Sequence, residues 1–225
     1  MSIPIATQTL PRPSERRVRV RAASARADAL LRRTLDLAVS GLALLLLLPV
    51  LALITLLIRL DSPGPTLFVQ RRVGLDGREF SVFKFRSMYT DAEKRLDALL
   101  GTNERSGPVF KMRRDPRVTR AGRFLRRSSL DELPQVLNVL RGEMSLVGPR
   151  PALPREVALY TPEQEGRLSV LPGLTGLWQV SGRAKLSFEE SVALDLDYIA
   201  RQSVWLNLAL IVRTIPAVLT GHGAY

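Results

Sequence analysis

An uncharged apolar stretch from Leu37 to Ile58 restricts the folds open to this chain more than any other feature. Most of its positions are Leu, Ala, Val or Ile, and about 22 helical residues span roughly 33 Å, enough to cross a bilayer. A signal peptide is disfavoured because the run starts far into the chain, is too long and has no small-residue cleavage site behind it. The alternative, a buried helix of a soluble protein, would need protein on every side. The stretch therefore predicts a membrane-embedded helix.

The charges on both sides of this stretch bear on its topology. Eight arginines lie between residues 12 and 33 against Glu15 and Asp28, and the downstream flank carries Arg59, Arg71, Arg72 and Arg78 against two aspartates. The positive-inside rule places both flanks in the cytoplasm. Pro49 removes a backbone hydrogen bond and kinks a helix. These features predict a re-entrant helix-break-helix, and a straight single span is the alternative.

The composition limits the chemistry. The chain has 225 residues, a net charge of +12 and no cysteine, and its one histidine is His222. Disulfides, thiol nucleophiles and cysteine-based zinc sites are therefore excluded, and a Ser-His-Asp triad is disfavoured. Carboxylate, hydroxyl and Lys/Arg chemistry remains, with Mg²⁺ or Mn²⁺ as the metal that suits oxygen ligands. The excess of cations predicts an anionic partner: a nucleic acid, a phosphorylated substrate or an anionic lipid.

The chain divides into three predicted parts: a disordered basic arm (1–27), the re-entrant membrane helix (28–60) and a cytosolic domain (61–225). We expect an α+β fold, monotopic in the membrane, with a small β-hairpin and a mainly helical catalytic domain that carries amphipathic interfacial helices. The elements on which this rests are hairpin strands at 66–70 and 79–85, a helix over 130–140, a strand at 178–180, and an apolar element over 204–219. For the last element, Trp205 favours a membrane interface, and packing against the core is an equal alternative.

Asp131 and Glu132 form a pair of adjacent carboxylates at the start of the helix predicted over 130–140. Ser129 as N-cap, with Glu132 three residues later, fits a capping box. One interpretation is that the two acids only stabilise the helix by complementing the positive end of its dipole. The basic surroundings favour a second reading, work on an anionic substrate, because Lys84, Arg86 and Arg150 supply further phosphate ligands.

Four blocks of sequence carry a resemblance to a known family. They are Lys84-Phe-Arg-Ser-Met88, Ser129-Leu-Asp-Glu-Leu-Pro-Gln135, the segment from Asn138 to Pro151, and the segment from Pro172 to Arg183. In this order they resemble the bacterial sugar transferases, the monotopic phosphoglycosyl transferases. The resemblance covers about residues 30–225. Family members often have Ser-Pro at the helix break, where this chain has Leu48-Pro49.

The resemblance implies a reaction and its participants. Such enzymes move a sugar 1-phosphate from a UDP-sugar to undecaprenyl phosphate and release UMP, at the cytoplasmic face of the bacterial inner membrane with its anionic lipids. The resemblance makes Asp131 the nucleophile that forms an aspartyl-phosphosugar and places Mg²⁺ beside it, with Glu132 positioning the metal or the phosphate. It leads us to expect exopolysaccharide or surface glycan initiation, with galactose or glucose as the sugar and no nucleic acid partner.

Further expectations are less constrained. Arg183 and Gln179 are candidates for nucleotide or sugar contacts, and a structural role is open for each. A homodimer is also left open. The length leads us to expect the minimal form of the family. The competing interpretations are a membrane-tethered binding protein without catalysis, which would leave the Asp131-Glu132 pair unexplained, and a regulatory pseudoenzyme, which the complete set of Asp131, Glu132, Lys84 and Arg150 disfavours.

Overall fold

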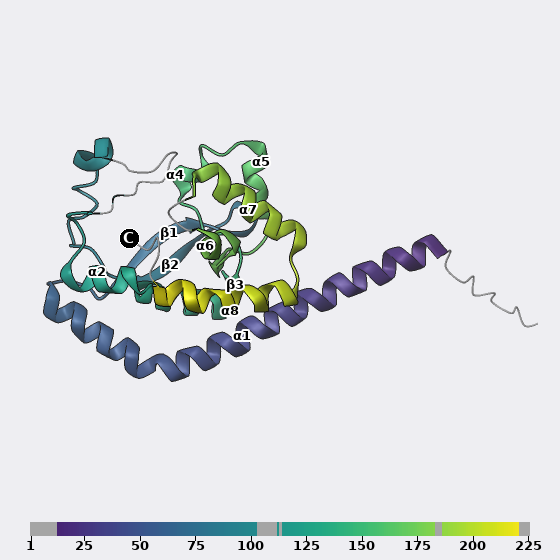
Figure 1. The fold of residues 1–225 in the computed structure, drawn as a ribbon, viewed down its shortest axis with the longest axis horizontal. Helices are drawn as coiled ribbons and strands as arrows, with labels where there is room; N and C mark the ends of the chain where they lie inside the picture. Colours follow the sequence, from purple (N-terminus) through teal and green to yellow (C-terminus); the bar gives the residue numbers. More distant parts are fainter. Residues whose placement is uncertain (1–12, 103–111, 113, 183–185, 221–225) are drawn as a thin grey trace, which may run out of the picture.

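The computed structural model describes residues 13–102, 112, 114–182 and 186–220. The described chain is an α+β structure in which helices predominate (Figure 1). Its α-helices are α1 (Pro13–Asp61), α2 (Arg120–Arg127), α3 (Val136–Arg141), α4 (Pro154–Val157), α5 (Pro162–Glu165), α6 (Leu177–Ser181), α7 (Phe188–Arg201) and α8 (Val204–Thr220). Its 3₁₀ helices are η1 (Leu75–Gly77), η2 (Asp97–Thr102), η3 (Leu130–Gln135) and η4 (Gly166–Ser169). Its strands are β1 (Leu67–Val73), β2 (Glu79–Phe85), β3 (Ser145–Val147) and β4 (Gly173–Thr175).

Helix α1 is long enough and apolar enough to cross a membrane, and it is the one such helix among the described residues. Only 11% of its most apolar window is buried, which argues against the core helix of a soluble protein. Figure 1 shows that α1 is bent and that the rest of the described chain lies on its concave side. Pro49 lies inside the helix and accounts for a bend, because it cannot donate a backbone hydrogen bond. The re-entrant topology stays a prediction.

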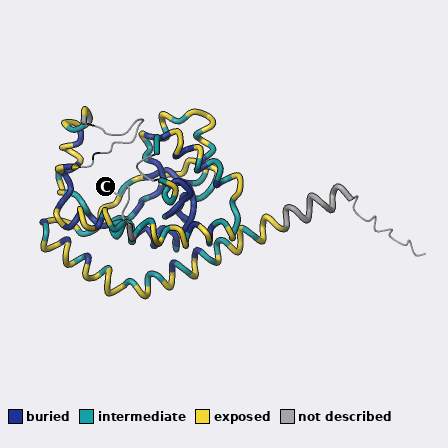
Figure 2. The backbone as a smooth tube through the Cα atoms, viewed as in Figure 1, coloured by how far each residue is buried: buried dark blue, intermediate teal, exposed yellow. Residues whose placement is uncertain are grey.

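The start of α1 differs from the expected basic arm. The helix begins at Pro13, within the arm that the sequence predicted to be disordered up to residue 27, and residues 1–12 of that arm lie outside the described residues. Proline suits the first position of a helix, and the Arg- and Ala-rich segment behind it has high helix propensity. Exposed positions continue along most of the described length of α1 (Figure 2). The exposed leucines of its apolar part are Leu37, Leu42, Leu45, Leu46, Leu48, Leu53, Leu56, Leu57 and Leu60.

Polar side chains in the middle of α1 and at its C-terminal end attach it to the remaining structure. Asp28 accepts a hydrogen bond from the first backbone amide of α8 (3.0 Å), and Arg33 donates to the carbonyl of Val139 in α3 (2.8 Å). Asp36 is buried and accepts from the amide of Leu146 in β3 (3.0 Å). At the C-terminal end, Asp61 accepts from the amide of Ala121 in α2 (3.0 Å). These two sets of contacts fix the position of α1 against the domain.

Strands β1 and β2 form the antiparallel hairpin that the sequence predicted. Leu67 pairs with Phe85 at the open end, and Val73 pairs with Glu79 beside the connection. The connection is η1, in which Asp76 and Gly77 both have positive φ. Short polar residues and glycine tolerate this conformation, which explains why the chain turns here. The hairpin places Lys84 near the end of β2, beside the segment that carries the acidic pair.

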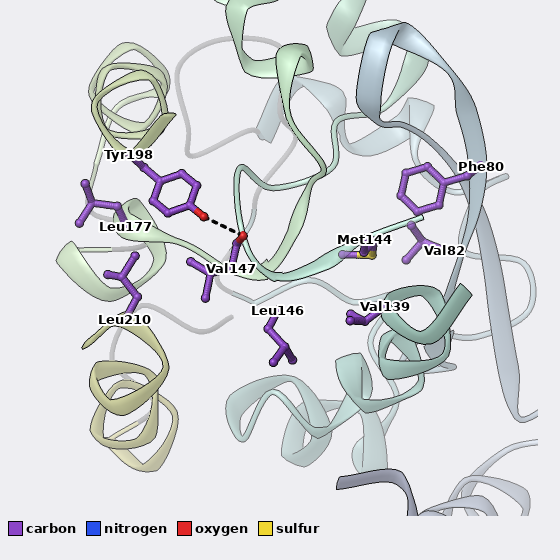
Figure 3. Packing of buried hydrophobic residues seen from close by; sticks show 9 residues of the cluster. All are labelled: Phe80, Val82, Val139, Met144, Leu146, Val147, Leu177, Tyr198 and Leu210. Atoms are coloured by element: carbon purple, nitrogen blue, oxygen red, sulfur yellow. Dashed lines mark hydrogen bonds between the residues drawn. The ribbon is translucent and has the colours of Figure 1, made fainter. Parts of the chain in front are cut away.

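The main core lies between the hairpin, the short strands β3 and β4, and the C-terminal helices (Figure 3). Phe80 and Val82 of β2 face Val139 and Met144, while Tyr198 of α7 donates a hydrogen bond through its hydroxyl to the carbonyl of Val147. β3 pairs in parallel with β4, with Ser145 opposite Gly173. This strand pair was not predicted from the sequence. The two strands are three residues each and lie far apart in the chain.

Two further sequence predictions can be compared with the helices. The strand predicted over 178–180 is wrong, since these residues belong to helix α6 and the strand β4 precedes them. The apolar element predicted over 204–219 is the helix α8. One side of α8 is buried through Asn207 and Leu210, and Trp205 on the other side is 80% exposed. The helix therefore has both a core face and an exposed apolar face, and its contact with a membrane stays a prediction.

Candidate active site

The acidic pair lies in a tight bend between α2 and α3. Ser129 stands just before η3 with φ of 57°, a left-handed conformation that is uncommon outside glycine. Asp131 and Glu132 follow in the first turn of η3, which continues as α3 and ends at Gly142. The helix predicted over 130–140 is thus present, with a 3₁₀ first part that contains Pro134.

The predicted capping box is wrong. The Ser129 side chain makes no capping hydrogen bond, and the Glu132 side chain turns to a different partner. Lys84 of β2 donates to the Glu132 Oε1 atom at 2.6 Å, and both side chains are partly buried. This ion pair joins the hairpin to η3 and directs the Glu132 carboxylate away from the helix backbone. The short distance between Lys84 and Glu132 is the main geometric feature of the candidate site.

The two adjacent carboxylates have opposite pKa shifts. Burial, together with the neighbouring charge of Glu132, raises the pKa of Asp131 to about 6, and the charges of Lys84 and Arg126 oppose this rise. For Glu132, burial acts in the same upward direction, but the bound ammonium of Lys84 prevails and lowers its pKa. Asp131 is therefore the carboxylate whose charge is less well compensated. It remains mostly ionised at neutral pH and has no ion-pair partner of its own among the described residues.

Two arginines from other elements complete the cationic surroundings of Glu132. Arg150, in the loop after β3, and Arg72, in β1, both act to lower the pKa of Glu132. Arg72 is buried, donates to the carbonyl of Pro151 (3.0 Å) and binds the Gln70 side chain. Burial, followed by the like charge of Arg150, lowers the pKa of Arg72 to about 9. The sequence prediction included Arg150 and missed Arg72, because inward-facing arginines on a short strand have no signature of their own.

Three other predicted site residues lie apart from this group or beyond the described chain. Arg86 is buried and donates to the backbone carbonyls of Ser62 (2.6 Å) and Pro63 (2.7 Å) and to the Ser62 hydroxyl, so it ties the end of α1 to the end of β2. Gln179 donates to the carbonyl of Leu174 (3.2 Å), a contact that supports the turn between β4 and α6. Arg183 lies outside the described residues.

Helix α2 approaches the segment after β2 very closely. A Cβ atom added at Gly122 would lie 1.9 Å from the carbonyl oxygen of Ser87. The same carbonyl accepts a hydrogen bond from Thr119, whose side chain caps α2 by accepting from the Gly122 amide. Only glycine allows this separation, because side chains do not come so near to a backbone oxygen. The contact holds α2, and with it the bend that carries Asp131, against the strand that carries Lys84.

Comparison with known proteins agrees with this arrangement of motifs. The model of the family described as "Bacterial sugar transferase" matches residues 27–221, nearly the whole chain. The chain belongs to this family. The match includes the hairpin, the acidic pair, the Pro-Arg-Pro loop and helices α6 to α8, and it starts within α1. The family resemblance inferred from the four sequence blocks is thereby confirmed.

Several curated relatives are similar to this chain. "Galactosyl transferase CpsE" of Streptococcus agalactiae is 49% identical over 168 residues, which cover 74% of this chain and 37% of the relative. "Undecaprenyl-phosphate glucose phosphotransferase" of Komagataeibacter xylinus is 47% identical, over 88% of this chain and 37% of the relative. "Exopolysaccharide production protein ExoY" of Rhizobium meliloti is 40% identical, over 86% of this chain and 88% of the relative. The chain thus spans well under half of the first two relatives and most of the third.

The family resemblance implies Mg²⁺, and the acidic pair offers chemistry that suits it. Among the described residues, no group of three or more Asp, Glu, His or Cys side chains could hold a metal ion alone. Mg²⁺ is commonly bound by one or two carboxylates together with substrate phosphates, so two adjacent acids are sufficient. Burial, followed by the neighbouring charge of Glu132, raises the pKa of Asp131, so a second negative charge in this pair is costly without a cation. A divalent cation would supply the opposite charge, with Asp131 and the Glu132 Oε2 atom, which Lys84 does not bind, as its protein ligands.

Proposed function

We propose that this protein transfers a hexose 1-phosphate from a UDP-sugar to undecaprenyl phosphate. The reaction would start the assembly of an exopolysaccharide or surface glycan at the cytoplasmic face of the bacterial inner membrane. The observation that carries the proposal is the Asp131-Glu132 pair. Lys84 binds Glu132 at 2.6 Å, other cations surround the pair, and a helix with exposed leucines lies beside it. The names of similar proteins support undecaprenyl phosphate as acceptor, and galactose or glucose as the sugar.

In the proposed mechanism, Asp131 is the nucleophile. A carboxylate oxygen of Asp131 attacks the β-phosphorus of the UDP-sugar, and the bond between that phosphorus and the oxygen that bridges to the α-phosphate breaks. UMP leaves with this bonding pair, and an aspartyl-phosphosugar remains. A phosphate oxygen of the lipid then attacks the same phosphorus and restores the free carboxylate of Asp131. A pKa of about 6 leaves Asp131 ionised and nucleophilic near neutral pH.

The surrounding cations have separate roles in this proposal. Lys84 keeps Glu132 ionised and oriented, so that the pair remains dianionic when the substrate arrives. Arg150 and Arg72 place positive charge where the transferring phosphate accumulates negative charge. Mg²⁺ bound by Asp131 and Glu132 would neutralise phosphate oxygens. Helix α1, with its apolar face exposed, brings the acceptor lipid and the catalytic group to the same membrane surface.

The test is UMP release by the purified, detergent-solubilised protein with Mg²⁺ and a panel of UDP-sugars. Without acceptor lipid, we expect a burst of at most one UMP per protein, and with undecaprenyl phosphate, continuous turnover. Asp131→Asn should abolish the burst, because an amide is not a nucleophile. Asp76→Asn is the matched control: Asp76 is exposed in the hairpin turn at φ of 55°, which asparagine tolerates. A normal burst in Asp131→Asn would refute the covalent step, and no release from any UDP-sugar would refute the proposed donor.

A further inference from the structure

The loop that carries Arg150 is tied down along its backbone. Four consecutive carbonyl oxygens accept hydrogen bonds from three different elements. The bonds run to Pro149 from the amide of Gly173 (2.8 Å), to Arg150 from the Arg167 side chain (3.5 Å), to Pro151 from the Arg72 side chain (3.0 Å), and to Ala152 from the amide of Val73 (2.9 Å). Surface loops rarely have every carbonyl paired in this way. With φ also fixed at both flanking prolines, the backbone of Arg150 has little freedom.

Glu156 restrains the guanidinium end of the Arg150 side chain. Glu156 is 2% exposed, and its Oε2 atom accepts from the amide of Leu153 at 2.9 Å and lies 3.9 Å from a guanidinium nitrogen of Arg150. Its Oε1 atom has no hydrogen-bond partner among the described residues. A buried carboxylate is costly unless a cation compensates it, so Glu156 favours the conformation in which Arg150 stays close. Arg150 itself remains 31% exposed and is free to meet a ligand.

Arg167 is oriented in turn by Asp195 of α7. The Arg167 guanidinium makes two contacts with the Oδ2 atom of Asp195, at 2.9 and 2.7 Å, and a third with the Tyr160 hydroxyl at 2.6 Å. Both members of the ion pair are buried, and Asp195 is fully so. The Arg167 nitrogen that contacts Asp195 at 2.7 Å also donates to the carbonyl of Arg150. A connected set of contacts therefore runs from the middle of α7 to the backbone of the candidate catalytic arginine.

We propose that Glu156 and the buried Arg167–Asp195 pair are positioning residues that hold Arg150 in place for the transferring phosphate. This rests on the proposed function, in which Arg150 stabilises the phosphate. None of these residues touches the substrate, and all act through Arg150. A displacement of about 1 Å in a positioned group can reduce a rate by about a hundredfold. These contacts already restrict the conformation of Arg150, so its side chain does not have to lose that conformational freedom in each catalytic cycle.

The kinetic test uses Glu156→Gln and Asp195→Asn. Both substitutions keep the shape of the side chain and remove its charge. We expect a roughly ten- to hundredfold lower kcat for UMP release with little change in the KM of the donor, since the arginine acts on developing charge. The matched controls are Glu163→Gln, an exposed acid in α5, and Asp197→Asn, a half-exposed acid in α7 that pairs with Arg201. In an Arg150→Lys background, Glu156→Gln should add less than about a threefold further loss, because coupled residues are not additive.

A second readout does not depend on activity. Hydrogen exchange of the Leu153 amide, and of the Gly173 and Val73 amides that donate to the loop, should be at least about tenfold faster in Glu156→Gln and Asp195→Asn than in the two controls. Unchanged exchange, or full additivity with Arg150→Lys, would overturn the positioning role. If the native protein releases no UMP from any donor, the proposed function fails, and the exchange rates still decide whether these residues hold the loop. If it releases UMP and the variants behave as the controls do, only the positioning proposal fails.

Discussion

Gly122→Ala should separate the two halves of the candidate active site. The new Cβ atom would lie 1.9 Å from the Ser87 carbonyl oxygen, and such contacts are essentially never closer than 3.0 Å, so the gap must open by at least 3.0 − 1.9 = 1.1 Å. The neighbour is backbone and cannot rotate away. Overpacking of this kind costs about 1–3 kcal/mol or more, and the gain of up to about 1 kcal/mol from alanine in a helix offsets only part of it. We expect a clear loss of thermal stability.

The larger effect should be on activity. The displaced helix α2 leads directly into the bend at Ser129, while Ser87 follows the strand that carries Lys84. A shift of about 1 Å between them would disturb the 2.6 Å contact between Lys84 and Glu132 and reduce UMP release by about a hundredfold. The assay is UMP release together with thermal unfolding in detergent. Gly101→Ala is the control, since nothing lies within 4 Å of its added Cβ. Activity and stability of Gly122→Ala that match this control would refute the reasoning.

Four further outcomes are expected. Mg²⁺ should raise the Tm much more at pH 7 than at pH 5. With a pKa of about 6, Asp131 is about nine-tenths ionised at pH 7 and about one-tenth at pH 5. Without metal, the raised pKa predicts that the Asp131 contribution to stability falls as pH rises from near 3.8 through about 6, and Asp131→Asn should remove both effects. Arg86→Lys should lower the free energy of unfolding by about 1–3 kcal/mol, because a single ammonium lacks the fork of two nitrogens that binds Pro63 and Ser62; an unchanged Tm would refute this structural role. Cysteines introduced at Ser24 and Pro65, both exposed, should be labelled from the same side of the membrane if α1 is re-entrant, and from opposite sides if it is a span.

The elements that the sequence predicted correctly have local signals. The hairpin has two β-rich runs on either side of Gly74-Leu-Asp-Gly77, and these runs pair in the structure. Such signals depend on neighbours within a few residues, so they can be recognised without a fold. The four motif blocks likewise identified the family, because several residues occur together in a fixed order.

The features that the sequence did not predict depend on partners far along the chain. Glu132 fits a capping box in sequence, but Lys84, 48 residues away, takes its carboxylate. The β3–β4 pair joins segments about 28 residues apart. Trp178-Gln-Val180 is strand-like by composition, yet it forms part of helix α6, which follows β4 in the chain. Arg86 was predicted to bind phosphate from its place in a motif, and its partners at Ser62 and Pro63 follow only from how α1 ends. Charged side chains in particular have several suitable partners, and only the fold selects one.

The attachment of α1 has a consequence for how the protein is made. The buried Asp36 finds its partner in the amide of Leu146, 110 residues later, and Asp28 finds its partner in Val204, 176 residues later. During synthesis the apolar helix therefore leaves the ribosome long before the chain that satisfies its polar side chains exists. The catalytic segments must then fold against a helix that is already in place, which makes α1 a template for the domain as well as its attachment to the membrane. Removing α1 to obtain a soluble fragment would leave β3, α2 and α8 each without a contact that their backbone amides require.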